Sequence, residues 1–228
     1  MHGEPAAAIR ERIGRDGPIT FATFMELALY GPGGYYDDPP VGSDGDFVTS
    51  PHVHAAFGTF VARAIEPLRD ALDADPFHMT EVGAGDGTLA RQILASLPDV
   101  AYTAVEISAG ARAALGAVDG VRVAADIARP VDLLLAHEVL DNLPFRVVRD
   151  GMEIMIDVDR GGALVERAMP VDEELREVVG SSTSEERIVP VGALGLIERI
   201  AATVERGYAL LIDYGDEGSA GPVHGYRA

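Results

Sequence analysis

Short apolar runs alternate with amphipathic stretches along most of this chain, and the alternation is its first structural signal. The apolar runs have the length of buried strands and occupy residues 77–82, 102–107, 121–124, 131–136 and 208–212. Helices are predicted over residues 53–72, 88–97, 109–118 and 191–204, and in the first of these, apolar residues recur at the three-and-four spacing of a helix face. This order predicts an α/β fold with a mostly parallel sheet and helices on both faces.

Two shorter helices are predicted before the first strand. They cover residues 6–13 and 21–30 and are separated by Gly17–Pro18, a dipeptide typical of a turn. In the longer amphipathic stretch over residues 53–72, Pro67 removes a backbone N–H and crowds the preceding turn. We therefore expect a kink or a division of that helix near Pro67.

From residue 145 onward the pattern becomes that of an antiparallel meander. Short β-rich runs continue to residue 167 and are interrupted at Asp150–Gly151 and Gly161–Gly162, both typical of hairpin turns. A short helix over 172–179 and a polar loop over 180–187 follow. We expect one domain, 1–228, made of N-terminal helices and a lid loop (1–76), an α/β core (77–144 and 188–228) and an inserted segment (145–187).

The stretch FHMTEVGAGDGTLARQIL, residues 77–94, joins a predicted strand to a predicted helix through the alternate glycines Gly83, Gly85 and Gly87. Glycine lets the backbone approach a ligand closely, and the following helix offers free N–H groups. Thr88 stands where a dinucleotide-binding turn would have its third glycine, and Glu81 adds a carboxylate before the turn. The spacing resembles the S-adenosylmethionine loop of class I methyltransferases, which implies cofactor binding by these residues. A tight turn without a ligand would show the same glycines.

Two further acids follow later strands of the predicted sheet. Glu106 ends the second strand, about 20 residues past the last glycine, where a βαβ nucleotide site places the carboxylate that binds ribose hydroxyls. Adjacent parallel strands end at the same edge of a sheet, so Glu106 should lie beside the glycine turn. Asp126 follows the third strand, where we expect it to reach an adenine amino group.

The fourth strand ends in AHEVLDNLPF, residues 136–145, which places two acids, Glu138 and Asp141, beside His137 and Asn142. Open α/β sheets bind their ligands at this carboxyl edge. The two carboxylates could hold a cationic substrate, or one could accept a proton from an attacking nitrogen. Alternatively, Asp141 caps a turn and Glu138 is solvated.

A long segment rich in Gly, Pro, Asp and Ser, residues 29–51, is predicted to be a loop. Loops of this length are often lids, and this one combines aromatic residues such as Tyr36 with small polar ones such as Thr49 and Ser50. It could equally wrap the core. We expect the histidines that follow, His52 and His54, to be surface or capping residues.

Composition excludes several classes of function. The formal net charge of −19 argues against a nucleic-acid partner, which would require phosphate neutralisation. The chain has no cysteine, and all of its basic residues are arginine. No apolar run approaches the roughly 18 residues of a membrane span, and we expect no membrane association. The absence of cysteine and of a signal-peptide core leads us to expect a cytoplasmic protein.

Several blocks of sequence resemble the MidA-like family of class I methyltransferases, whose mitochondrial members assist assembly of respiratory complex I. The matching blocks are LALYGPGGYY (27–36), GDFVTSP (45–51), EVGAGDGTL (81–89), VEIS (105–108), HEVLDNLP (137–144) and LLIDYG (210–215). They span nearly the whole chain in the order of the family.

The resemblance implies S-adenosylmethionine as methyl donor and, for the mitochondrial members, an arginine side chain of a protein as acceptor. It implies that the glycine turn packs against the methionine part of the donor, that Glu106 binds its ribose, and that Glu138 and Asp141 lie beside the transferable methyl group. The lid residues that match the family are Gly45, Asp46, Thr49 and Ser50. His52, His137 and Asn142 depart from the residues common in the family. The complete sheet of such enzymes has seven strands, so we expect its C-terminal edge strands to be missing here.

Two other functions remain open from the sequence. A non-catalytic member of the same fold would bind the donor, or nothing, and act in assembly or interaction. A nicotinamide-dependent oxidoreductase would use the same kind of βαβ unit, although Thr88 in place of a third glycine argues against it. Catalysis by a methyltransferase requires no metal, because positioning and electrostatics supply most of the rate.

Overall fold

A computed structural model describes residues 4–36, 48–179 and 186–214 of the chain. Its elements are α1 (Glu4–Asp16), β1 (Ile19–Thr20), α2 (Phe21–Met25), the π-helical turn η1 (Glu26–Tyr30), α3 (Ser50–Val53), α4 (Ala56–Leu72), β2 (His78–Val82), α5 (Thr88–Ser96), β3 (Ala101–Val105), α6 (Ala109–Leu115), β4 (Val121–Ala124), β5 (Leu133–His137), the 3₁₀ turn η2 (Leu140–Asn142), β6 (Arg146–Arg149), β7 (Met152–Val158), β8 (Leu164–Pro170), α7 (Glu173–Val179), β9 (Arg187–Val189), α8 (Val191–Thr203) and β10 (Tyr208–Ile212). The α/β class and the predicted strands are confirmed.

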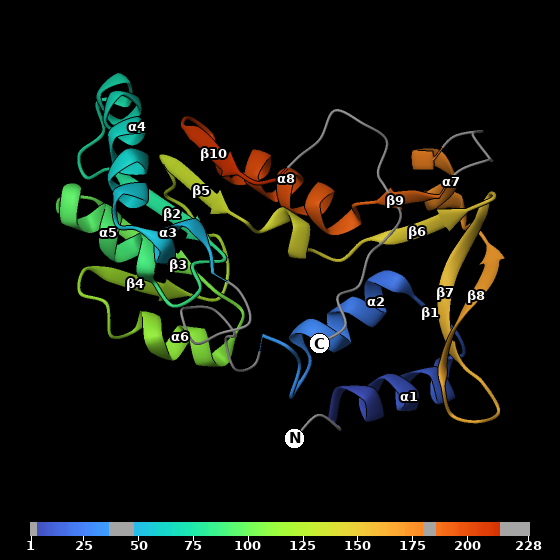
Figure 1. Ribbon diagram of the computed structural model, residues 1–228. Coiled ribbons are helices and arrows are strands. Elements are labelled where there is room, and N and C mark those ends of the chain that lie inside the picture. Colours follow the sequence, from blue (N-terminus) through green and yellow to red (C-terminus); the bar gives the residue numbers. More distant parts are fainter. Residues whose placement is uncertain (1–3, 37–47, 180–185, 215–228) are drawn as a thin grey trace.

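A parallel sheet forms one half of the molecule, with the strand order β10-β5-β2-β3-β4 (Figure 1). All of its pairs are parallel, and β2, the strand before the glycine turn, pairs with both β3 and β5. The strands β2, β3 and β5 are largely buried, as expected for strands covered on both faces. The carboxyl ends of β2, β3, β5 and β10 therefore meet at one edge.

Alternate residues of the central strands pack into different helix layers. Leu133 and Leu135 of β5 join the apolar cluster of α4 and α5, whereas Leu134 packs with Leu196 and Ile200 of α8. Leu115 of α6 packs against β3 in a further cluster. The sheet is thus covered by α4, α5 and α6 on one face and by α8 on the other, which explains why apolar runs were the strongest signal in the sequence.

An antiparallel sheet forms the other half, in the order β1-β7-β6-β9 with β8 paired to β7. The hairpin between β6 and β7 turns at Asp150–Gly151, whose φ angles of 52° and 74° fit a two-residue turn of the type predicted. The short edge strands β1 and β9 were not predicted. We expected a loop to continue through Arg187, but this residue pairs with Val148 at the start of β9.

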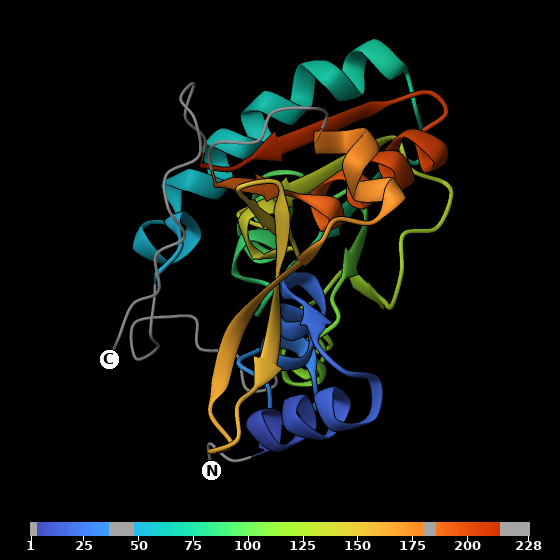
Figure 2. The same ribbon diagram turned by 90° about the vertical axis from the view of Figure 1, so that its right-hand side faces the viewer.

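The N-terminal helices belong spatially to the antiparallel sheet. Figures 1 and 2 show α1 and α2 beside the hairpin β7–β8, and Ile9 and Ile13 of α1 share an apolar cluster with Ile156 of β7. The predicted helix over 21–30 ends in a π-helical turn, and that over 53–72 is divided before Ala56 into α3 and α4. Pro67 does not divide it, because α4 continues past this residue to Leu72.

Candidate functional site

The carboxyl edge of the parallel sheet carries most of the polar residues singled out in the sequence. The glycine turn follows β2, Glu106 follows β3, and the segment with Glu138 and Asp141 follows β5. Because β2 lies between β3 and β5, the sheet order brings these three segments together. The predicted juxtaposition therefore rests on strand order and on the shared direction of the strands.

The glycine turn adopts a backbone that favours glycine. Gly83, Gly85 and Gly87 have φ angles of 69°, 54° and 79°, all in the left-handed region. At Gly83 a Cβ atom would lie 2.6 Å from Cγ2 of Val139, so close packing excludes a side chain. At Gly85 a Cβ atom would have no neighbour within 4 Å in the described part of the chain. The turn is therefore packed at Gly83 and open at Gly85.

Glu106 is fastened to this turn by its side chain. Its Oε2 accepts a hydrogen bond from the backbone N–H of Gly85 at 3.0 Å, and its Oε1 accepts one from the N–H of Ser108 at 2.8 Å. Ser108 in turn caps α6, as predicted, by accepting from the N–H of Ala111. The carboxylate is 8% exposed and fixed in position, and each oxygen retains lone pairs for a further donor such as a hydroxyl group.

Glu81 takes no part in the two hydrogen bonds that fix Glu106. It is 3% exposed, and its Oε2 accepts a hydrogen bond from the hydroxyl of Tyr102 at 2.7 Å. Burial raises the pKa of Glu81 to about 8, although the Tyr102 hydrogen bond opposes the shift. Glu81 alternates with Thr80 along β2 and shares the side of Met79, which packs under α4 and α5. The structure places its side chain inside this layer, and contact with the donor stays a prediction.

Asp126 is directed to another partner. Its side chain is 71% exposed and forms an ion pair with Arg199 of α8. Its Oδ1 also accepts a hydrogen bond from the N–H of Ile127 at 2.7 Å. The carboxylate of Asp126 is therefore paired with a residue of α8, and its contact with an adenine ring stays a prediction.

The segment after β5 is held in a strained conformation. Glu138 has a φ of 52°, which is uncommon for a residue with a side chain. Its N–H donates to the carbonyl of Ile212 at 2.8 Å, and its Oε1 lies 3.1 Å from Nε2 of His137 and 3.4 Å from the hydroxyl of Tyr214. Burial lowers the pKa of His137, against the opposing effect of Glu138 and Asp213. The strained residue is thus fixed by β10 and its neighbours.

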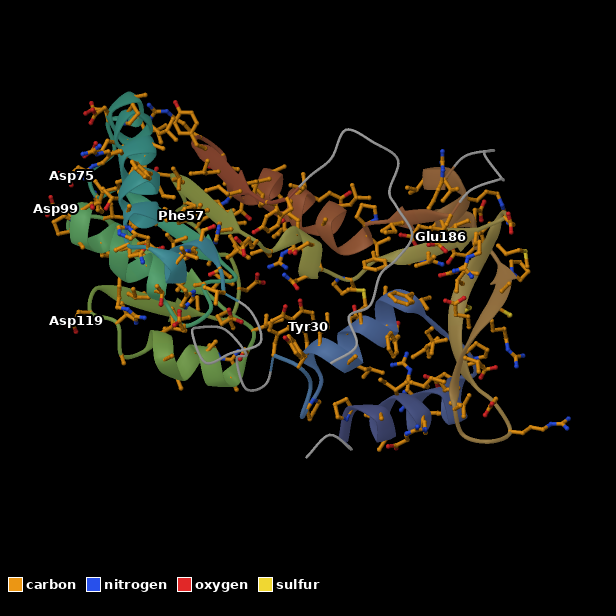
Figure 3. The ribbon with its side chains drawn as sticks, viewed as in Figure 1. Tyr30, Phe57, Asp75, Asp99, Asp119 and Glu186 are labelled. Atoms are coloured by element: carbon orange, nitrogen blue, oxygen red, sulfur yellow. The ribbon has the colours of Figure 1, made fainter. Side chains whose placement is uncertain are left out.

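Asp141 and Asn142 meet the N-terminal segment at this edge. Burial raises the pKa of Asp141, and the nearby charges of Asp213 and Glu138 add to the shift. The hydroxyls of Tyr30 and Tyr36 both donate to Asn142, at 2.6 Å each. Figure 3 shows Tyr30, the last residue of η1, near the segment that follows β5.

The predicted lid residues fall into two groups. Gly45 and Asp46 lie outside the described residues, whereas Thr49 and Ser50 lie at the start of α3. The hydroxyl of Thr49 lies 2.9 Å from Nδ1 of His52, whose Nε2 lies 3.2 Å from Oδ2 of Asp86 in the glycine turn. The expectation that His52 is an ordinary surface or capping residue is wrong, because its side chain links α3 to the turn and is 16% exposed.

Three residues of the site were missed in the sequence. Asp86 accepts hydrogen bonds from the N–H and the hydroxyl of Thr88, each at 2.9 Å, at the start of α5. Asp213 follows β10 and accepts a hydrogen bond from the N–H of Leu140 at 2.8 Å, so the rule of the carboxyl edge could have found it. Tyr30 lies in the block LALYGPGGYY, but nothing local indicates that its hydroxyl would reach Asn142.

Comparison with known proteins connects this geometry to a family. A family model described as "Putative S-adenosyl-L-methionine-dependent methyltransferase" matches residues 60–228. A crystal structure from Burkholderia thailandensis with S-adenosyl-homocysteine bound has a TM-score of 0.81 and 30% identity, and it covers 93% of this chain and 62% of that one. A native crystal structure from the same organism has a TM-score of 0.78 at 30% identity, over 94% of this chain and 62% of that one.

Curated relatives are named as protein arginine methyltransferases. The mitochondrial NDUFAF7 homolog of Drosophila melanogaster is 30% identical over 271 residues, which is 95% of this chain and 61% of the relative. The mitochondrial NDUFAF7 of Mus musculus is 29% identical over 263 residues, 91% of this chain and 59% of the relative. The chain thus spans about three fifths of the length of the proteins it matches.

The expected cytoplasmic location is contradicted by these relatives, which are named as mitochondrial. The expectation rested on the absence of cysteine, which fits reducing surroundings in general and does not distinguish one compartment from another. On membranes, none of the helices in the described ranges is both long and apolar enough to span a bilayer.

Proposed function

The chain belongs to the family described as putative S-adenosyl-L-methionine-dependent methyltransferases, and from this premise we propose that it transfers a methyl group from S-adenosylmethionine to a protein side chain. Arginine is the acceptor favoured by the names of the curated relatives. The observation that carries the proposal is the contact between Glu106 and Gly85, which joins the ends of β3 and β2.

Glu106 and the glycine turn fit the donor. A ribose presents two adjacent hydroxyl donors, and the two oxygens of a fixed carboxylate are suited to accept them. The open side of Gly85 would leave room for a ligand close to the backbone. We propose that Gly83, Gly85, Gly87 and Glu106 form the donor site. Thr49 and Ser50 would contact the donor from the end of the lid.

Glu138 and Asp141 support an acceptor site beside the donor. Both follow β5 at the same edge, and Glu138 is held in one conformation by β10. One carboxylate can hold a guanidinium through charge-assisted hydrogen bonds, and a second can accept the proton lost by the nitrogen that is methylated. Burial raises the pKa of Asp141, which favours this carboxylate as a proton acceptor. The net charge of −19 would also favour encounter with a basic protein segment.

The chemistry required of the chain is mainly orientation. S-adenosylmethionine, when bound, supplies an electrophilic methyl group on a sulfonium. The roles left to the protein are to align an acceptor nitrogen, to exclude water and to accept the proton that this nitrogen loses. We propose Glu138 as the residue that holds the cationic acceptor and Asp141 as the one that accepts the proton.

The proposal is tested by transfer of a labelled methyl group to peptides. We would incubate the protein with methyl-labelled donor and arginine-containing peptides, beside matched peptides in which lysine replaces arginine. We expect label only in the arginine peptides, and its loss in Glu138→Gln. Calorimetry with S-adenosyl-homocysteine should give the same affinity for Glu138→Gln as for the unchanged protein. Donor binding without transfer to any peptide would favour a non-catalytic binding role, and absence of both would reject the proposal.

A further inference from the structure

Asn142 is contacted by two tyrosines that come from a distant part of the chain. The hydroxyl of Tyr36 donates to the side-chain Oδ1 of Asn142, and the hydroxyl of Tyr30 donates to its backbone carbonyl, each at 2.6 Å. Tyr30 ends η1 and Tyr36 follows it closely, whereas Asn142 ends η2 after β5. Asn142 therefore joins the N-terminal segment to the proposed acceptor site.

The nitrogen of the same amide contacts both proposed acceptor residues. Nδ2 of Asn142 donates to Oδ1 of Asp141 at 2.8 Å and to the backbone carbonyl of Glu138 at 3.3 Å. A flipped amide would turn its oxygen toward these two acceptors and its nitrogen toward the Tyr36 hydroxyl. Asp141 and the Glu138 carbonyl can only accept, so they select the orientation in which Nδ2 donates to them, and the Tyr36 hydroxyl then holds the amide in place by donating to Oδ1.

The two tyrosines are themselves well fixed. Their rings stack with centroids 5.5 Å apart and an interplanar angle of 16°. The N–H of Tyr36 donates to the carbonyl of Leu29 at 2.9 Å, which folds this part of the chain back onto η1. Burial raises the pKa of Tyr36 to about 12 and moves the pKa of Tyr30 upward as well, so both hydroxyls remain donors at neutral pH.

Asn142 also bears on a strained residue. Glu138 has a φ of 52°, and such a conformation persists only where surrounding contacts over-determine it. Ile212 holds its N–H, and Asn142 holds its carbonyl. The side chain of Asn142 thus restrains the backbone of one acid and the carboxylate of the other.

We propose that Asn142 is a positioning residue for methyl transfer, oriented by Tyr36 and Tyr30, so that Asp141 and Glu138 are aligned only while the N-terminal segment is docked. The inference rests on the proposed function, because it assigns these acids to the acceptor. The inference makes the segment from Tyr30 to Tyr36 part of the acceptor site, in addition to its predicted place in the lid.

The inference is tested without substrate by the titration of one carboxyl group. Selective ¹³C labelling of aspartate carboxyls, with the Asp141 signal assigned by its loss in Asp141→Asn, would follow its pKa. Removal of a donor to the charged form raises a carboxyl pKa, so we expect a rise of about 0.5 to 1 unit in Asn142→Ala and a smaller rise in Tyr36→Phe. Tyr30→Phe, which removes only the bond to the backbone carbonyl, should give the smallest change.

Transfer kinetics give the second reading. We expect kcat to fall about five- to tenfold in Asn142→Ala, the effect of losing a hydrogen bond or two in the transition state. Affinity for S-adenosyl-homocysteine should stay within about twofold, since Asn142 makes no described contact with Glu106 or the glycine turn. Thr203→Val is the matched control for Tyr30→Phe, because each variant removes one hydroxyl that donates to a backbone carbonyl, and Thr203 lies on α8.

The possible results separate the inference from the function on which it rests. If the Asp141 titration is the same in Asn142→Ala, Tyr36→Phe and the unchanged protein, the inference is overturned whatever the activity. A parallel loss of donor affinity and kcat would also overturn it, because it would indicate general loosening. A shifted titration in a protein that transfers no methyl group would support the orientation of Asp141 and reject the proposed function.

Discussion

The backbone N–H of Gly58 on α4 donates to Oε1 of Gln92 on α5 at 3.1 Å. The other end of the same amide, Nε2 of Gln92, donates to the carbonyl of Pro51 in α3 at 2.8 Å. Gln92 therefore fixes both helices that follow the lid segment against the helix that follows the glycine turn. This junction also holds His52 in reach of Asp86.

A side chain at Gly58 should disrupt this junction. Its Cβ atom would collide with Cβ of Gln92, so Gly58→Ala should lower the free energy of unfolding by about 1–3 kcal/mol. Gly195→Ala is the matched control, since Gly195 also lies within a helix but its Cβ would meet nothing within 4 Å in the described ranges. It should be neutral or stabilising, by up to about 1 kcal/mol. Chemical denaturation measures both, and equal effects would contradict the packing described.

The buried pair of Glu81 and Tyr102 predicts a pH dependence of stability. The folded pKa of Glu81 is raised to about 8 from an ordinary value of 4.5, chiefly by burial. Its contribution to stability is therefore fully present below pH 4.5 and is lost as the pH rises toward 8. Glu81→Gln keeps an acceptor for the Tyr102 hydroxyl and removes the titration.

The difference in stability between Glu81→Gln and the unchanged protein should accordingly increase in favour of the variant between pH 4.5 and 8. We expect a change on the order of 5 kcal/mol, measured by urea denaturation at several pH values. Asp126→Asn, at an exposed carboxylate, is the control and should not reproduce this trend. A difference that stays constant with pH would show that Glu81 is ionised throughout.

Gly85 offers a test of the open side of the turn. Gly85→Ala should weaken binding of S-adenosyl-homocysteine by at least about tenfold, because the added methyl group would occupy space proposed for the ligand. Gly162→Ala in the hairpin β7–β8 is a matched control. Both glycines have positive φ, 54° and 86°, and no described atom within 4 Å of a Cβ. Similar melting temperatures with unequal affinities are expected, and equal affinities would exclude ligand contact at Gly85.

The sequence was sufficient for features that depend on strand direction and order. Glu106 could be placed beside Gly85 because parallel neighbours end at one edge, whatever the intervening helix. The hairpin at Asp150–Gly151 was readable because its turn demands positive φ at both positions. The face of the sheet on which Glu81 lies also follows from the sequence, because Glu81 and Met79 are two residues apart along β2.

Other features depend on contacts between distant segments and left no local trace. β1 consists only of Ile19–Thr20 and exists because β7 pairs with it. The position of Tyr30 against Asn142 depends on how the N-terminal helices pack on the antiparallel sheet. The ion pair of Asp126 with Arg199 requires α8 to lie over the sheet, which no spacing along the chain reveals. The division into a single domain with an insertion stays a prediction.

The account depends most directly on the role of Glu106. Isothermal calorimetry with S-adenosyl-homocysteine should show binding to the unchanged protein and a loss of at least about tenfold in affinity for Glu106→Gln, since one charged acceptor of the ribose hydroxyls is removed. Glu153→Gln, in the antiparallel sheet, should retain the unchanged affinity if it folds, as judged by circular dichroism. Equal affinity of Glu106→Gln and the unchanged protein, or no binding by either, would contradict the account.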